Sequence, residues 1–374
     1  MKTETRFALF YAAAIGALSF VPFLSPWIAK THGAVFVGPV LAILPLGRLL
    51  GGTGWAWVAD RSGRPELVVR GAAIATAVFA AALWFAPSVT TFVLALGGFA
   101  LMRAPQFPIV DAAALDTLGS RYGQVRMWGS LVFLALVLLA GETRALSDAA
   151  PLAAAWVLLL VAAALSFTLP FPERPPKSPG WSNLVALGAY RPMWWLMAIA
   201  MGQGMTLTAY DSMFTLHAEE VGLGDRMVSI ALAVGVLGEV LVMANAPMLL
   251  SRVRPETLIL LAALSGIPRW LVTATASSGA AMITAQALHA LGFGAFWIGG
   301  TRWVSTHAPA ELRSTAQSLF PAAGWGLGYL TSMGIASLVV PALGTRALFL
   351  TSSAEAIAVS AMALWLWRMP NSQT

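Results

Sequence analysis

The chain has 374 residues, of which 58% are hydrophobic and only 10% are charged, and its formal net charge is +6. A soluble globular domain carries roughly 25% charged residues, so this composition excludes a protein whose main solvent is water. The basic residues stand between hydrophobic runs, so membrane topology explains them better than nucleic-acid binding does. Because there is no cysteine, disulfides and thiolate metal sites are excluded as well.

Long unbroken apolar runs predict membrane-spanning helices. Runs such as LVFLALVLLAG and AAAWVLLLVAAALSF lack the alternation of a transmembrane barrel. A bilayer core takes about 20 apolar residues per helix, and segments rich in Gly, Pro and charge separate the runs. We therefore predict an all-α integral membrane protein with twelve transmembrane helices. The predicted helices are, in chain order, about 7–28, 35–58, 67–86, 89–115, 123–141, 150–170, 192–216, 227–250, 256–275, 279–305, 313–340 and 346–367.

The longest hydrophilic break is FPERPPKSPGWSN, residues 171–183, and its proline content predicts an extended linker. It divides the chain into an N-terminal six-helix half (1–171), a cytoplasmic linker (172–190) and a C-terminal six-helix half (191–374). With the N-terminus inside, thirteen Lys and Arg residues fall on the cytoplasmic side and four on the other. This asymmetry predicts a multi-pass protein of the inner (plasma) membrane with both termini in the cytoplasm.

Charged side chains fall inside several predicted spans, where each costs about 2.5–3.5 kcal/mol on insertion. They are Arg48, Arg103, Asp111, Arg126, Asp211, Glu239, Arg269 and Arg302. Structural ion pairs or snorkelling side chains are the alternative, above all for Arg48 and Arg302, which a small boundary shift would move to the surface. We favour a functional role for Asp111, Arg126, Glu239 and Arg269.

Four segments in order along the chain carry a resemblance to a known family. They are VDAAALDTLGSRYGQVRMWGSLVF (110–133), GVLGEVLVMANAPMLL (235–250), SGIPRW (265–270) and AQALHALGFGAF (285–296). On these segments the chain resembles the phenylpropionate permease family of the major facilitator superfamily, which is related to lactose permease-type proton symporters. The resemblance implies two six-helix halves that rock around a substrate held between them near the midplane.

The resemblance also implies roles for individual residues. Asp111 and Arg126 correspond to a pair that lines the substrate site, and Phe133 stands where lactose permease stacks the sugar on a Trp. Trp128, close to Arg126, is a further candidate. On the seventh predicted helix, Asp211 and Gln203 complete the expected substrate-binding residues. The lysine expected to pair with Asp211 is absent, so we expect Asp211 to be either unpaired and protonatable or facing water.

Glu239, Arg269 and His289 match the proton-coupling network of the same relatives. Movement of an arginine relative to Glu239 would let that carboxylate load and release a proton, and His289 would relay it. The alternative for His289 is a hydrogen-bonded core histidine. One departure matters: lactose permease has its proton-carrying acid one turn after the histidine, where this chain has Gly292.

Two further segments predict structure rather than chemistry. WAWVADRSGR (55–64) resembles the superfamily's loop motif after the second helix, in which Asp60, Arg61, Gly63 and Arg64 fit a gating role while Ala56 replaces the usual glycine. GWGLGYLTSMG (324–334) predicts close helix packing.

The leading hypothesis is a secondary active transporter that imports a small organic solute, namely an aromatic carboxylic acid, a sugar or a nucleoside, together with a proton. The alternative is proton-antiport efflux of drugs or metabolites. A membrane enzyme or a sensor is disfavoured, because no catalytic constellation is present. We expect substrate, proton and lipid as partners, no nucleic acid, no cofactor, no metal and a monomer.

Overall fold

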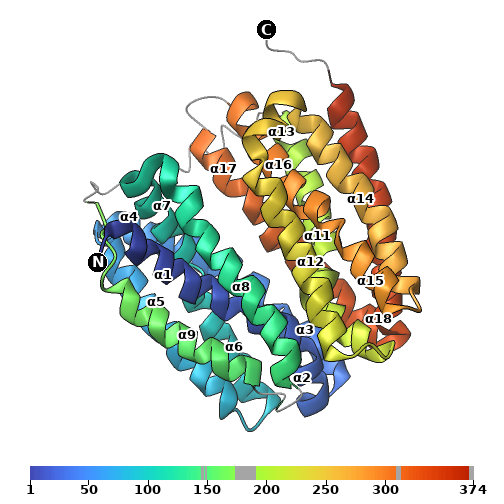
Figure 1. Ribbon diagram of the computed structural model, residues 1–374, viewed down its shortest axis with the longest axis horizontal. Helices are drawn as coiled ribbons and strands as arrows, with labels where there is room; N and C mark the ends of the chain where they lie inside the picture. Colours follow the sequence, from blue (N-terminus) through green and yellow to red (C-terminus); the bar gives the residue numbers. More distant parts are fainter. Residues whose placement is uncertain (145–146, 148–149, 173–190, 309–312, 370–374) are drawn as a thin grey trace. The chain divides into compact units, whose positions relative to one another are not determined.

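The computed structural model describes residues 1–144, 147, 150–172, 191–308 and 313–369, and every element in these ranges is a helix (Figure 1). Contacts divide the chain into two compact units, Met1–Pro179 and Gly180–Thr374. Residues 173–190 of the predicted linker lie outside the described residues, so the linker stays a prediction.

The first unit is a bundle of apolar helices joined by short turns. In chain order these are α1 (Thr3–Gly16), the 3₁₀ segment η1 (Ala17–Phe23), α2 (Leu24–His32), η2 (Ala34–Phe36), α3 (Val37–Leu41), α4 (Ile43–Ser62), α5 (Pro65–Trp84), α6 (Val89–Arg103), α7 (Gln106–Leu118), η3 (Gly119–Arg121), α8 (Tyr122–Arg144) and α9 (Ala150–Ser166). Helix α1 lies beside α8 and α9, and α5 lies beside α6 (Figure 1).

Local sequence signals set the ends of these helices. Gly63 ends α4 in the left-handed region at φ 61°, which glycine adopts without steric cost. Pro65 then opens α5 at a position where its missing N–H costs nothing. Ser88 caps α6 through a reciprocal pair of hydrogen bonds with Thr91.

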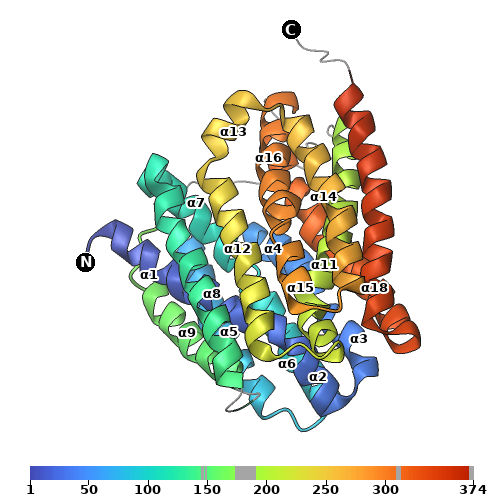
Figure 2. The same ribbon diagram turned by 45° about the vertical axis from the view of Figure 1, so that its right-hand side comes forward.

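The second unit contains the two longest described helices, α11 with 30 residues and α18 with 40. Its elements are α11 (Arg191–Glu220), α12 (Asp225–Ala244), α13 (Ala246–Arg252), α14 (Pro255–Thr275), α15 (Gly279–Gln286), the π-helical segment η4 (Ala290–Ala295), α16 (Phe296–His307), α17 (Arg313–Pro321), the π-helical segment η6 (Ala322–Gly328) and α18 (Tyr329–Arg368). Helix α18 packs along both α11 and α14 (Figure 2).

In the described residues, nine helices are long and apolar enough to cross a membrane. Three predicted spans are not counted separately. Ala150–Ser166 has only 17 residues, α11 is not among the nine, and the last two predicted spans fall within Leu319–Arg368. Gly344 has a non-helical backbone inside α18, at φ 79° and ψ 173°, so two helices meet there. The all-helical membrane fold is confirmed, while the count of twelve spans stays a prediction.

Glycines bring α11 and η6 into direct backbone contact. A Cβ atom on Gly204 would overlap the carbonyl oxygen of Gly324, and one on Gly328 would overlap that of Met201. Small residues allow such close approach between membrane helices. The close packing predicted for the segment 324–334 is therefore present along its first turn.

We expect Gly204→Ala to destabilise the protein by about 1–3 kcal/mol, since the added methyl group forces the two backbones apart. Thermal unfolding of the detergent-solubilised protein measures the effect. The matched control is Gly334→Ala, where an added Cβ meets nothing within 4 Å. Equal melting temperatures for the two variants would show that this contact does not limit the packing.

Candidate functional site

Asp111 and Arg126 lie close together in the first unit. The Asp111 carboxylate on α7 accepts a hydrogen bond from the Tyr11 hydroxyl of α1 at 2.6 Å and lies 3.5 Å from Arg126 Nε on α8. The Tyr11 ring packs edge-on against Tyr122. This group offers a solute one carboxylate, one cation and phenolic hydroxyls, and its role in binding stays a prediction.

The two aromatic candidates lie on different faces of α8. Phe133 follows Arg126 by seven residues, so the two share a face, whereas Trp128 follows it by two residues and does not. Trp128 is 53% exposed. Of the two rings, Phe133 is therefore the better placed to contact a solute beside Arg126.

Arg269 is the central polar group of the second unit. It lies on α14 and is 1% exposed. Its Nε and Nη2 atoms donate to the side-chain oxygen of Gln286 on α15 at 3.1 and 2.9 Å, and Gln286 donates in turn to Thr273 Oγ1 at 3.1 Å. The guanidinium carbon lies 4.4 Å from the Tyr210 ring centroid and 4.1 Å from that of Trp270. Hydrogen bonds and cation–π contacts thus hold this cation inside the bundle.

The contact between Arg269 and His289 determines where the imidazole carries its proton. Arg269 Nη1 lies 3.0 Å from His289 Nδ1, and because arginine only donates, Nδ1 is the acceptor. The imidazole proton is then on Nε2, which lies 3.6 Å from Glu239 Oε2 on α12. The structure therefore brings the three predicted coupling residues into one chain of contacts.

Gln203 joins this cluster from α11. Its side-chain amide donates to the carbonyl oxygen of Gly292 at 2.8 Å. Gly292 lies in the π-helical segment that follows His289, and such segments are frequent at functional sites.

Asp211 has a hydrogen-bond partner that the sequence did not predict: its carboxylate accepts from the Tyr329 hydroxyl of α18. The Asp211 side chain is half-buried, so its expected exposure to water stays a prediction. Tyr329 belongs to the glycine-rich segment that was predicted only to pack, and it gives Asp211 a neutral hydrogen-bond donor.

The residues of the predicted gating motif lie at the end of α4. The Arg61 guanidinium lies 5.1 Å from the Trp57 ring centroid, and Arg61 and Arg64 are both exposed. The side chain of Asp60 lies outside the described residues. The gating role stays a prediction.

Of the other intramembrane charges, Arg103 is buried and donates to the carbonyl oxygen of Ala14, while Arg48 and Arg302 are exposed. Sequence analysis missed Tyr11, Gln286, Tyr210 and Tyr329 as partners of the candidate residues. Gln286 had a signal: it precedes His289 by three residues and so lies on the same helix face.

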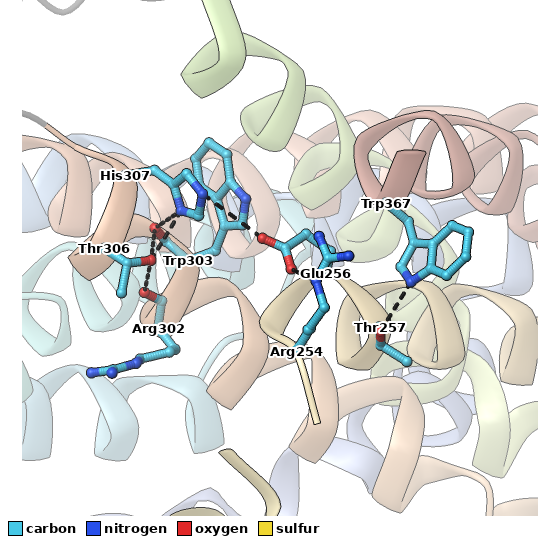
Figure 3. Close-up of polar contacts among 8 residues, drawn as sticks. All are labelled: Arg254, Glu256, Thr257, Arg302, Trp303, Thr306, His307 and Trp367. Atoms are coloured by element: carbon cyan, nitrogen blue, oxygen red, sulfur yellow. Dashed lines mark hydrogen bonds and ion pairs between the residues drawn. The ribbon is translucent and has the colours of Figure 1, made fainter. Parts of the chain in front are cut away.

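A separate polar group joins the start of α14 to the end of α16 (Figure 3). Glu256, in the first turn of α14, lies 3.3 Å from Arg254 Nε and 3.9 Å from His307 Nε2. The His307 ring stacks on Trp303 at 4.4 Å between centroids. A carboxylate is favoured at a helix N-terminus, so the geometry gives this group a structural role.

We expect Gln286→Leu to destabilise the protein by about 1–3 kcal/mol, because it leaves two buried donors of Arg269 without their acceptor. Gln286→Glu keeps an acceptor there and should lose much less. Thermal unfolding in detergent distinguishes the two variants. A leucine variant as stable as the parent protein would show that the Gln286 contact does not hold Arg269.

Comparison with known proteins identifies relatives of this chain. The chain is 27% identical over 313 residues to a protein of Escherichia coli (strain K12) named "Probable 3-phenylpropionic acid transporter", covering 78% of this chain and 79% of the relative. It is 29% identical over 339 residues to "Maltose permease" of Geobacillus stearothermophilus, covering 87% and 84%. The relatives are transporters, not enzymes.

Solved structures share the fold. The nucleoside transporter NupG superposes with a TM-score of 0.85 at 14% identity, covering 99% of this chain and all of that one. A D-xylose-proton symporter superposes with a TM-score of 0.74 at 13% identity, covering 99% and 97%. At these identities the likeness concerns the fold alone.

A family model described as "MFS_1 like family" matches residues 5–350. The resemblance found in the four sequence segments is thereby confirmed. The chain belongs to the MFS_1-like family and is a transporter of the major facilitator type.

Proposed function

We propose that this protein is a proton-coupled symporter of a small organic solute, working by alternating access in the inner membrane with both termini in the cytoplasm. The observation that carries the proposal is the contact chain from Arg269 through His289 to Glu239 in the second unit. It connects a permanent cation, a titratable ring and a carboxylate inside an apolar bundle.

The coupling step follows from hydrogen-bond chemistry. While Arg269 Nη1 donates to His289 Nδ1, that nitrogen has no lone pair left for a proton. A proton binds there only after Arg269 has moved away, and the imidazolium so formed faces Glu239, whose charge stabilises it. The hydrogen bond from Arg269 and the binding of a proton at His289 Nδ1 therefore exclude each other.

The solute would contact Asp111 and Arg126, with Phe133 on the same face of α8. A carboxylate and an arginine suit either the hydroxyls of a sugar or nucleoside or the carboxylate of an aromatic acid. Relatives named for 3-phenylpropionic acid and for maltose support this range of substrates.

Alternating access requires two halves that move against each other. We assign these to residues 1–171 and 191–374, with 172–190 as the cytoplasmic linker and Asp60, Arg61, Gly63 and Arg64 as the gating motif. Alternating access around one site is the usual scheme for such transporters, and the family membership supports it.

Uptake into proteoliposomes under an inward proton gradient tests the proposal, with 3-phenylpropionate, maltose and a nucleoside as solutes. We expect gradient-driven accumulation of one solute class by the parent protein. Glu239→Gln should lose accumulation yet keep equilibrium exchange, because the variant still binds the solute but lacks the negative charge that stabilises a protonated His289.

Glu142→Gln makes the same chemical change at an exposed position near the end of α8 and serves as the control. Expulsion of solute under the same gradient would favour antiport efflux. Transport that ignores both the gradient and Glu239→Gln would refute proton coupling.

A further inference from the structure

A polar cluster at the C-terminal end of α11 lies outside the groups described above. Its histidine, His217, is 1% exposed, and Thr345 of α18 is fully buried, whereas Glu220, the last residue of α11, is exposed. His217 Nδ1 lies 2.8 Å from Thr345 Oγ1, and the same oxygen contacts a carboxylate oxygen of Glu220. One threonine hydroxyl thus lies between a buried imidazole and a carboxylate that reaches solvent.

The second nitrogen of the His217 ring also has a partner. His217 Nε2 lies 2.9 Å from the carbonyl oxygen of Thr273 on α14. A carbonyl oxygen only accepts hydrogen bonds, so Nε2 carries a proton and donates it. The charge of the ring is therefore decided at Nδ1, where it meets Thr345.

The Thr345 hydroxyl has one hydrogen for two neighbours. Glu220 is exposed, where a carboxyl group is ionised at neutral pH and can only accept hydrogen bonds. When Thr345 donates to Glu220, the hydrogen between Thr345 and His217 must come from Nδ1. The contacts are then all satisfied if both nitrogens of His217 carry a proton. With a neutral ring, one of the two contacts of Thr345 lacks a hydrogen.

Opposing effects act on the charge of this ring. Burial disfavours the imidazolium form, and so does the Arg346 guanidinium of α18. The Thr273 carbonyl of α14 and the Glu220 carboxylate of α11 favour it. The Phe349 ring of α18, 4.9 Å from the imidazole between centroids, is uncharged. Among these groups Glu220 supplies the negative charge, so proton binding at His217 depends on it.

We propose that His217, Thr345 and Glu220 form a second proton-binding site, separate from His289 and Glu239. Glu220 takes up a proton from water and passes it to Thr345 Oγ1, while the hydrogen of that hydroxyl passes to His217 Nδ1. Glu220 is then again a carboxylate that accepts from Thr345, and His217 is an imidazolium that donates from both nitrogens.

Proton binding at this site connects three helices. Thr345 directly follows Gly344, where the two parts of α18 meet, and the protonated cluster bonds it to α11 and, through His217, to α14. Loss of the proton leaves Thr345 able to donate to one of its two neighbours and releases the other. The sidedness of the site rests on the proposed function, because cytoplasmic termini place this end of α11 on the opposite side of the membrane. The binding of the proton itself does not rest on it.

The site shares a residue with the support of Arg269. Thr273, whose carbonyl oxygen accepts from His217, also accepts at Oγ1 from the Gln286 amide. Gln286 in turn accepts two hydrogen bonds from Arg269. The proton on His217 is therefore held beside the residues that fix the buried arginine.

Nitrogen-15 NMR of the purified full-length protein, labelled in its histidine rings, tests the site. The chain has four histidines, and His217→Gln identifies the signal of this ring. We expect His217 of the parent protein to gain a proton at Nδ1 as the pH is lowered from about 8 to about 5. Glu220→Gln should lower its proton affinity about tenfold or more, because the variant lacks the charge that stabilises the imidazolium. Glu66→Gln makes the same chemical change near the start of α5 and should leave the affinity unchanged.

A pair of variants at Thr345 tests the hydroxyl. Thr345→Val keeps the size of the side chain but removes the hydroxyl, so it should lower the proton affinity of His217 as Glu220→Gln does. Thr345→Ser retains the hydroxyl and should retain most of the affinity. A merely structural role of Thr345 would leave the titration of His217 the same in both variants.

The outcomes separate this inference from the proposed function. A His217 ring that stays neutral down to about pH 5, or a proton affinity that neither Glu220→Gln nor Thr345→Val lowers, would overturn the site and leave gradient-driven uptake through Glu239 intact. An equal loss of affinity in Glu66→Gln would also overturn it, since the effect would then reflect net charge. Failure of proton-driven uptake would leave the site standing, because the titration needs neither solute nor gradient.

Discussion

A polar group inside an apolar helical bundle must find its partner on another helix, because lipid supplies none and water is scarce there. Arg269 is the more deeply buried of the two buried arginines among the described residues, with 1% of its surface exposed against 7% for Arg103. Gln286 accepts two of its hydrogen bonds, His289 accepts a third, and Tyr210 and Trp270 cover its faces. Satisfying this one group therefore fixes how α11, α14 and α15 lie against each other.

The irregular backbone of the second unit follows the same constraint. A π-helical turn disturbs the regular hydrogen-bond ladder, so it is tolerated where side chains satisfy the freed groups. Gln203 does this for the Gly292 carbonyl. Glycines at 204, 324 and 328 bring α11 close to η6, which supports Gln203 from the neighbouring turn. The close packing at Gly204 thus lies next in the chain to Gln203, which anchors the polar cluster.

Each unit holds a charged candidate residue with hydrogen-bond partners from other helices, and the two residues, Asp111 and Arg269, have opposite charges. In the first, a carboxylate is held by the Tyr11 hydroxyl and approached by Arg126. In the second, an arginine is held by an amide and donates to an imidazole. Of these two arrangements, the second puts a histidine directly between a cation and a carboxylate, which is why the proposed proton step involves that one.

Much of this protein was determined by its sequence alone. Long apolar runs predicted helices, because only helices satisfy the backbone of such runs in lipid. Asp111, Arg126, Glu239 and Arg269 stood out because a charge in a span is costly whatever packs around it. Only the tertiary structure decided that Gln286 and Tyr210 hold Arg269, that Tyr329 donates to Asp211 and that the His289 proton faces Glu239. These contacts join helices far apart in the chain, and helical periodicity gives the face of each helix but not the neighbour which that face meets.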